Sequence, residues 1–227
     1  MKEIKSDNYS IWLGENSLSK LDISGHSKAA ILVDENTKRD CLPKLPQLDN
    51  SIIIEIKSGE EYKNINTCNF IWKQLTAHQF DRNSLLINLG GGVIGDMGGF
   101  AASTYKRGID FIHVPTTLLA MVDASVGGKL GIDFKDFKNQ IGLFNNPESV
   151  LIFPEFLETL PENQLKSGFA EVVKHALISD KILWGKLTNT SFESLDWKAI
   201  IETSIQIKNT IVLADPLEKG DRKKLNF

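Results

Sequence analysis

The sequence predicts an α/β protein in which a Rossmann-like domain with a parallel sheet is followed by an α-helical domain that is incomplete. Three observations support this prediction. Short apolar runs alternate with helical periods over the first two thirds of the 227 residues. A glycine-rich turn follows one of these runs, and no strand pattern recurs after Pro154. We therefore expect an α/β domain at residues 1–157 and the start of a helical domain at residues 158–227.

Five segments have the pattern of strands that are buried on both faces. Each is short, rich in aliphatic residues and bounded by polar residues, glycine or proline. Continuous rather than alternating apolar runs are typical of parallel sheets, whose two faces are both covered. These segments are residues 29–33, 52–56, 85–89, 111–114 and 150–153.

Helical spacing is clearest in three places. Residues 62–79 repeat apolar side chains every three or four positions, which predicts an amphipathic helix between two strands. Pro161 stands where a first helical residue is expected. The apolar face of the helix after it, and that of a later helix, consist of Leu165, Phe169, Val172, Val173 and Ala176, and of Trp197, Ile201, Ile205 and Val212.

Composition and charge exclude several classes of protein. Lys and Arg number 26 against 29 Asp and Glu, so a net charge of -3 gives no general attraction to nucleic acid or anionic membranes. No apolar run approaches the ~20 residues that cross a bilayer, and we expect no secretory signal. Two cysteines cannot form a disulfide framework. We expect a cytoplasmic protein that acts on small molecules, without nucleic-acid or membrane partners.

A glycine-rich turn follows the predicted strand at residues 85–89. Gly90, Gly92 and Gly95 fit the pattern GxGxxG, in which backbone N–H groups at a helix N-terminus approach a pyrophosphate. The turn is not in the first βαβ unit, and no acidic residue ends the next strand, so a close-packed turn without a ligand also fits. We predict that this turn binds a nucleotide phosphate.

Polar residues follow the first predicted strand. Asp34 and Asn36 lie at its carboxyl end, the ligand side of an open α/β sheet. An Asx-type turn or a helix cap explains the same residues equally well, and both alternatives stay open.

The segment at residues 115–139 holds the greatest density of reactive side chains. Gly127 and Gly128 place the Lys129 ammonium on a turn, a common anion-binding arrangement. Long loops within compact domains are usually functional, so we favour a binding role over a surface loop with scattered charges. The candidates in this segment are Thr116, Thr117, Asp123, Lys129, Lys138 and Asn139.

The predicted helices carry two further candidates. Glu171 and His175 are four residues apart, a spacing that could hold one metal ion, with Lys174 beside them. A solvated polar helix face is the more usual explanation. Lys208 lies within an apolar stripe, where its side chain either extends to water or projects into a cleft.

Five motifs taken together resemble the 3-dehydroquinate synthase family of sugar-phosphate cyclases. The resemblance covers essentially the whole chain, and its most specific part is the run from Pro115 to Asp133. The motifs are GGGVIGD at residues 90–96, PTTLLAMVDASVGGKLGID at 115–133, KN at 138–139, GFAEVVKH at 168–175 and DRKKLNF at 221–227.

The resemblance implies a reaction. The family converts 3-deoxy-arabino-heptulosonate 7-phosphate to 3-dehydroquinate and phosphate, in the shikimate pathway of aromatic amino acid biosynthesis. NAD is reduced and reoxidised within each turnover, around phosphate elimination, and an intramolecular aldol reaction closes the ring. A divalent metal, zinc or cobalt, holds the reacting hydroxyls. The resemblance also implies a homodimer.

The resemblance further implies roles for individual residues. The metal ligand is Glu171, whereas His175 does not match a ligand position. The residues implied for catalysis and substrate binding are Lys129, Asn139, Lys174, Lys208, Glu218, Arg222 and Asn226, with Arg107 reaching the phosphate site of a neighbouring subunit. The cofactor-binding residues implied are Asp34, Asn36, Glu60, Lys63, Gly91, Gly92, Val93, Asp96, Thr116, Thr117, Asp123, Lys129, Lys138, Asn139, Phe156, Thr159 and Leu160.

One departure from the family matters for activity. In the family, the LNF motif continues with Gly-His-Thr, whose histidine is the second metal ligand, and the third ligand is a later histidine. This sequence ends at Phe227. We therefore expect these 227 residues to bind zinc weakly and to lack cyclase activity. The alternatives are a related cyclase, a metal-dependent polyol dehydrogenase and a non-catalytic NAD-binding fragment.

Overall fold

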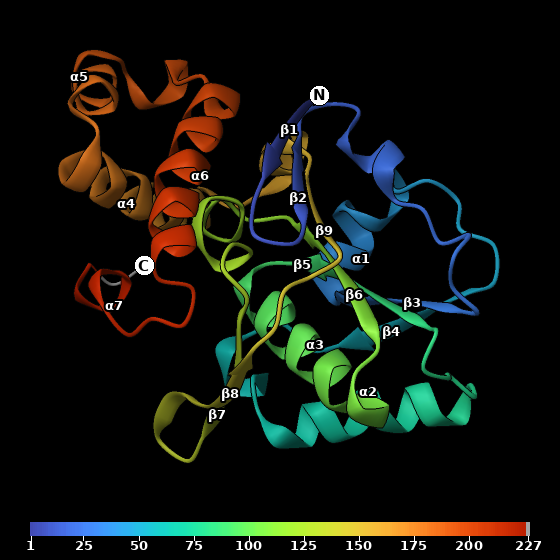
Figure 1. Cartoon of the computed structure of the whole chain (residues 1–227). Helices are drawn as coiled ribbons and strands as arrows, with labels where there is room; N and C mark the ends of the chain where they lie inside the picture. Colours follow the sequence, from blue (N-terminus) through green and yellow to red (C-terminus); the bar gives the residue numbers. More distant parts are fainter. Residues whose placement is uncertain (226–227) are drawn as a thin grey trace.

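A computed structural model describes residues 1–225 of the chain. Its centre is a seven-stranded sheet with the strand order β1-β2-β9-β6-β5-β3-β4 (Figure 1). All neighbouring strands are parallel except β1 and β2. The strands of this sheet are β1 (Lys2–Lys5), β2 (Ser10–Leu13), β3 (Ala29–Asp34), β4 (Ser51–Ile56), β5 (Leu85–Gly90), β6 (Asp110–Pro115) and β9 (Ser149–Ile152).

The predicted fold class is confirmed, and each of the five predicted strands is present. Every residue of β5 is buried, as is all of β3 except Asp34, because both faces of the sheet are covered. The sequence reasoning missed β1 and β2. β1 is mostly exposed at the sheet edge, so its four residues carry no buried apolar run.

The helices cover the two faces of the sheet unequally. α2 and α3 pack on one face with Leu32 and Leu86, while the other face shares one hydrophobic cluster with α4 and α6. Figure 1 shows α4, α5 and α6 grouped beside the sheet. The helices are α1 (Glu35–Asp40), α2 (Ile65–Ala77), α3 (Gly92–Thr104), α4 (Glu162–Ser179), α5 (Lys181–Asn189), α6 (Trp197–Ala214) and α7 (Asp221–Lys224).

The segment predicted to be a loop, residues 115–139, is mostly regular structure. It contains a π-helix at Ala120–Ala124 and continues into a two-stranded antiparallel hairpin, β7 (Lys129–Phe134) and β8 (Phe137–Phe144). The loop interpretation was therefore wrong. Most of β8 is exposed, so the alternation of buried and exposed side chains that marks a strand is missing there.

The region after β9 is helical in the part of the chain that the structure describes, as predicted. Pro161 is the N-cap of α4, one position before the first helical residue, which corrects its expected place. The hydrophobic cluster that contains Val172 and Ile205 also contains Ile31 of β3 and Ile87 of β5, so this region shares a core with the sheet. The boundary at residues 157 and 158 stays a prediction. Among residues 1–225, no helix is both long and apolar enough to span a membrane.

Candidate active site

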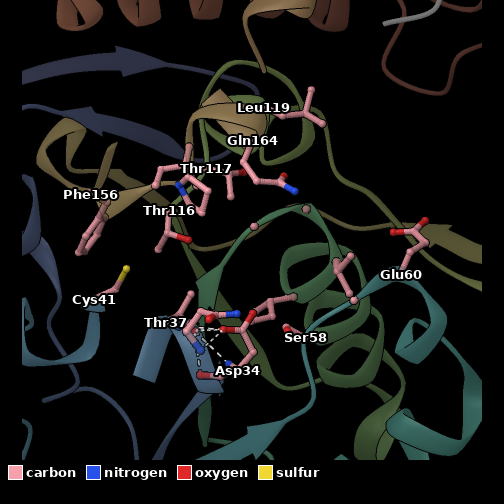
Figure 2. Close-up of a pocket in the computed structure, with 18 of the residues that line it drawn as sticks. Asp34, Thr37, Cys41, Ser58, Glu60, Thr116, Thr117, Leu119, Phe156 and Gln164 are labelled. Carbon is pink, nitrogen blue, oxygen red and sulfur yellow. Dashed lines mark hydrogen bonds between the residues drawn. The ribbon is translucent and has the colours of Figure 1, made fainter. Parts of the chain in front are cut away.

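A cleft of about 810 Å³ lies at the carboxyl ends of the parallel strands. Asp34 ends β3, Ser58 follows β4, and Thr116 follows β6 on its floor. In Figure 2, Gln164 from the first turn of α4 lies across the cleft from Asp34, and Phe156 lies at its side near Cys41. The cleft thus has the size of a small-molecule site and lies where ligands bind in open α/β sheets.

The glycine-rich turn forms one wall of this cleft. Gly91 is the N-cap of α3, and as a glycine it has no side chain to cap the first N–H groups of the helix. A Cβ on Gly91 would lie 3.0 Å from the Thr117 methyl carbon, so glycine lets the two segments approach. The exposed N–H groups and the helix dipole make this a suitable place for a phosphate.

Asp34 caps α1 and also lines the cleft. Its Oδ1 accepts hydrogen bonds from the backbone N–H groups of Asn36 (3.0 Å) and Thr37 (2.8 Å). Asp34 is therefore the N-cap of α1, as the helix-cap alternative predicted. Both Asp34 and Asn36 border the cleft as well, so the two alternatives do not exclude each other.

A buried lysine connects three elements at one end of the cleft. The Lys63 ammonium donates to Asp96 on α3 and to Asn139 on the hairpin, both at 2.6 Å. Burial raises the pKa of Asp96 to about 6, while the positive charge of Lys63 opposes this shift. On the hairpin beside them, Lys138 forms an ion pair with Glu60 at 3.3 Å. These contacts hold the hairpin against the start of α3.

A second cluster surrounds Asp123 on the π-helix. The buried ammonium of Lys208, from α6, forms an ion pair with Asp123. One ligand atom each from Asp123, Glu171 and His175 lies within 4.8 Å of the others. A π-helix is often found at functional sites, and this one turns its carboxylate toward two helices from the other end of the chain.

Glu171, Lys174 and His175, in the middle of α4, are turned toward the interior. His175 is fully buried, and its Nε2 lies 3.1 Å from Glu171 Oε1, to which Lys174 also forms an ion pair. Burial acts to raise the pKa of Glu171, but the hydrogen bonds from His175 and Lys174 outweigh it and lower the pKa to about 2. The expectation of a solvated polar face was wrong for these residues. Lys208 likewise projects into the protein rather than to water.

Lys129 and two residues near the end of the described chain, Glu218 and Arg222, complete the second cluster. Lys129 forms an ion pair with Glu218 at 2.7 Å, and the Arg222 guanidinium donates to the Gly127 carbonyl at 2.9 Å. Gly127 has a φ of +99°, and a Cβ there would lie 2.3 Å from Arg222 Nη2. Glycine at this position therefore allows Arg222 to pack against the turn that precedes Lys129.

The donor set at Asp123, Glu171 and His175 suits a divalent metal of intermediate softness. Two carboxylates and one imidazole are ordinary zinc ligands, and their separation is compatible with binding one ion. The resemblance implies only Glu171 among these three as a ligand. Asp123 is far from Glu171 and His175 in the sequence, and only the fold brings the three side chains together.

Most of the residues implied for the cofactor line the cleft. Asp123, Lys129 and Asn139 do not line it but lie in the clusters just described. The members that line it are Asp34, Asn36, Glu60, Lys63, Gly91, Gly92, Val93, Asp96, Thr116, Thr117, Lys138, Phe156, Thr159 and Leu160.

One of the implied residues, Arg107, is not brought to either cluster. Arg107 is exposed beyond the carboxyl end of α3, which is about 20 Å long and begins at the glycine-rich turn. Asn226 lies outside the described residues. Conversely, sequence reasoning missed Ser58 and Gln164, which line the cleft. The position of Ser58 after β4 could have revealed it, whereas Gln164 follows only from how α4 packs.

Two family models together match residues 53–227 of the chain. One described as 3-dehydroquinate synthase N-terminal matches residues 53–167, and one described as 3-dehydroquinate synthase C-terminal matches residues 168–227.

Curated relatives give the same family. The 3-dehydroquinate synthase of Campylobacter concisus is 43% identical over 226 residues, which are 98% of this chain and 64% of that protein. The bifunctional 3-dehydroquinate synthase/phosphatase of Fusobacterium nucleatum is 44% identical over 239 residues, covering all of this chain and 36% of that protein. The chain thus spans less than two thirds of the length of these relatives.

Solved structures share the fold. The 2-epi-5-epi-valiolone synthase of Streptomyces hygroscopicus, solved with NAD+ and Zn2+ bound, is 25% identical with a TM-score of 0.85, covering all of this chain and 67% of that one. A 2-deoxy-scyllo-inosose synthase is 23% identical with a TM-score of 0.83, and the match covers 100% of this chain and 68% of that one. At this identity the match shows similarity of fold. With half of the chain matched by one family model and most of the rest by its C-terminal counterpart, this chain belongs to the 3-dehydroquinate synthase family.

Proposed function

We propose that this chain carries the cofactor-binding and much of the substrate-binding apparatus of a 3-dehydroquinate synthase. The reaction would convert 3-deoxy-arabino-heptulosonate 7-phosphate to 3-dehydroquinate and phosphate. The observation that carries the proposal is the adjacency of the two clusters. Ala124 lines the cleft, and its neighbour Asp123 belongs to the carboxylate–imidazole cluster, so a substrate at Asp123 would lie beside a nucleotide in the cleft.

NAD is the cofactor that we propose for the cleft. The uncapped N-terminus of α3 at Gly91 and Gly92 suits the pyrophosphate, and the Asp34 carboxylate suits a ribose hydroxyl. When bound, NAD supplies a hydride acceptor that can return the hydride later in the same turnover. The chain's own task is to hold the dinucleotide and to exclude water with the side chains that line the cleft, Phe156 and Gln164 among them.

A divalent metal, zinc or cobalt, is proposed at Glu171. Asp123 and His175 are the neighbouring donors that fit the same ion. A bound metal would supply Lewis-acid polarisation of a substrate hydroxyl. The prediction that residues 1–227 alone bind zinc weakly and lack cyclase activity remains to be tested.

The cationic side chains would hold the anionic ends of the substrate. Lys129, Lys174, Lys208 and Arg222 approach the Asp123 cluster from different elements. Such groups bind phosphate and carboxylate through charge-assisted hydrogen bonds. The position of Arg107, away from the cleft of its own chain, is consistent with a role in a neighbouring subunit. The homodimer and the cytoplasmic location both stay predictions.

One assay separates this function from its alternatives. The sugar phosphate, NAD+ and zinc are incubated with a chain extended by the segment that follows LNF in the family, and released phosphate and NADH are recorded together. A cyclase that recycles its cofactor releases phosphate without accumulating NADH. NADH that accumulates in proportion to product would instead indicate a polyol dehydrogenase.

The same assay on the 227 residues alone tests the third alternative. A chain that binds NAD+ but releases no phosphate would behave as a non-catalytic NAD-binding fragment, which is the behaviour expected of this length. Phosphate release at a normal rate by the short chain would refute the expected inactivity.

A further inference from the structure

Two polar side chains are buried side by side in the middle of the apolar sheet. Asn88 on β5 and His113 on β6 occupy paired positions in the strand register, and they are 1% and 3% exposed. Asn88 Nδ2 lies 3.3 Å from His113 Nδ1. Neither residue lines the large cleft or belongs to the Asp123 cluster, so the proposed reaction leaves the pair unexplained.

The pair lies directly beneath the first two turns of α3. A Cβ on Gly98 would lie 2.0 Å from Asn88 Oδ1, and a Cβ on Gly95 would lie 3.8 Å from the His113 ring. Glycine at these positions lets the helix approach the amide and the imidazole closely. Asn88 is also two residues before Gly90, at which β5 ends and the glycine-rich turn begins. The pair therefore contacts the helix whose N-terminus forms the turn.

The chemistry of the pair allows a hydrogen bond between its two members. Burial lowers the pKa of His113 to about 4, so its ring is neutral near pH 7 and Nδ1 can accept the Asn88 N–H. The Phe111 ring, 5.1 Å away in an edge-on arrangement, restricts the imidazole from another side. Among the described residues, Asn88 Oδ1 has no hydrogen-bond partner. It points toward the Cα of Gly98, where a weak C–H···O contact is possible.

A small cavity separates the pair from the turn. Its volume is about 10 Å³, and its wall includes Asn88 and His113 as well as Gly90, Gly91 and Gly92. This space is at the lower limit for one water molecule, whose hydrogen bonds would need polar partners such as these. The cavity shows that the polar pair and the turn face the same small volume.

Burying an amide and an imidazole between apolar strands is unfavourable unless the groups are hydrogen-bonded. A hydrogen bond is directional, however, so it restricts how the Asn88 and His113 side chains lie relative to each other, which apolar contacts do not. We propose that Asn88 and His113 are positioning residues that set the place and rigidity of the glycine-rich turn for a nucleotide pyrophosphate. The nucleotide part of this inference rests on the proposed function, whereas the positioning part concerns the turn alone.

Four variants test the pair. Asn88→Leu and His113→Leu each remove one partner, and the double variant removes both. Leu86→Val is the matched control, because Leu86 is buried on the same strand and in the same hydrophobic cluster as α2 and α3. Hydrogen exchange is measured in the nucleotide-free chain at the amides of residues 95–98, which begin with the Gly95 N–H that donates to the Gly91 carbonyl. NAD+ affinity is measured by calorimetry, and stability by thermal unfolding.

We expect faster exchange at residues 95–98 in both single variants and NAD+ binding weakened about tenfold, equivalent to about 1.4 kcal/mol. The double variant should regain thermal stability, because no polar group is left unpaired, yet keep the fast exchange and weak binding. Leu86→Val should lose stability but keep both other properties. Unchanged exchange at the turn in all variants would overturn the positioning role. The two parts of the inference can fail separately. If exchange is faster in the variants but the parent chain binds no NAD+, the positioning role is supported and the nucleotide function is refuted.

Discussion

Lys208 on α6 and Asp123 on the π-helix form an ion pair that joins the helical region to the sheet. Lys208 is 2% exposed, and the side chain of Asp123 is 27% exposed. Burial lowers the pKa of Lys208, and the Asp123 carboxylate opposes this shift. The pair also sets the charge balance of the cluster, since Glu171 places a second carboxylate next to Asp123.

Replacing Lys208 with Met should destabilise the chain by about 3 kcal/mol, because Asp123 would lose its buried counter-charge beside Glu171. Denaturant unfolding measures the change. The exposed pair Lys2–Glu202, with an N–O distance of 2.5 Å, provides the control. Lys2→Met should change stability by no more than ~1 kcal/mol. Equal losses in the two variants would show that burial does not strengthen the Lys208 pair.

Asp96 should titrate near pH 6. Because burial raises its pKa from the usual 3.8 to about 6, the folded chain binds a proton more tightly than the unfolded chain. Its contribution to the free energy of unfolding is therefore complete below about pH 3.8 and is lost as the pH rises through 6. Lys63→Met should raise the pKa further, because the opposing positive charge is removed. Carbon NMR of the carboxyl group checks both values, and a midpoint below 3.8 in the parent chain would contradict the account.

Asp34 should show two separable roles. Asp34→Ala removes the cap of α1 and should cost about 1 kcal/mol of stability, whereas Asn caps helices nearly as well as Asp. Asp34→Asn should therefore keep the stability of the parent chain. If the carboxylate also binds a ribose hydroxyl, Asp34→Asn should still weaken NAD+ binding. Equal NAD+ affinity in the parent chain and Asp34→Asn would leave only the capping role.

Zinc binding should depend on Glu171. Glu171→Gln removes the carboxylate from the Asp123–Glu171–His175 cluster, and we expect zinc affinity to fall roughly tenfold or more, since even outer-shell changes cost roughly 10–100-fold. Glu162→Gln, at an exposed position on the same helix, is the matched control. A competition titration with a chromogenic chelator measures both. Zinc affinity that is the same in the two variants would remove Glu171 from the metal site.

The sheet could be predicted because its strands are buried on both faces. β3 and β5 consist of continuous aliphatic residues, a local signal that survives without any knowledge of neighbours. The exposed strands β1 and β8 carry no such signal, because most of their side chains face solvent. Their pairing depends on contacts with other segments rather than on their own residues.

The glycine-rich turn and the Asp123 cluster also differed in how far the sequence predicted them. The glycine-rich turn could be predicted because its spacing is local and follows a clear strand. Of the Asp123 cluster, the sequence offered the spacing of Glu171 and His175, but not that Asp123 lies beside them, because Asp123 comes from a short π-helix far away in the sequence. His175 is buried because α6 and the π-helix pack against α4, a tertiary effect that periodicity does not reveal.

The central claim is that the glycine-rich turn binds NAD, and calorimetric titration of NAD+ into the chain tests it most directly. Gly92→Val places a branched side chain at the first residue of α3, where a Cβ would already lie 3.4 Å from the Ala124 methyl group. Gly185→Val is the matched control, because a Cβ there has no neighbour within 4 Å. The account predicts one NAD+ per chain, with binding lost in Gly92→Val and kept in Gly185→Val. A folded chain that binds no NAD+, or a Gly92→Val variant that binds it unchanged, would contradict the account.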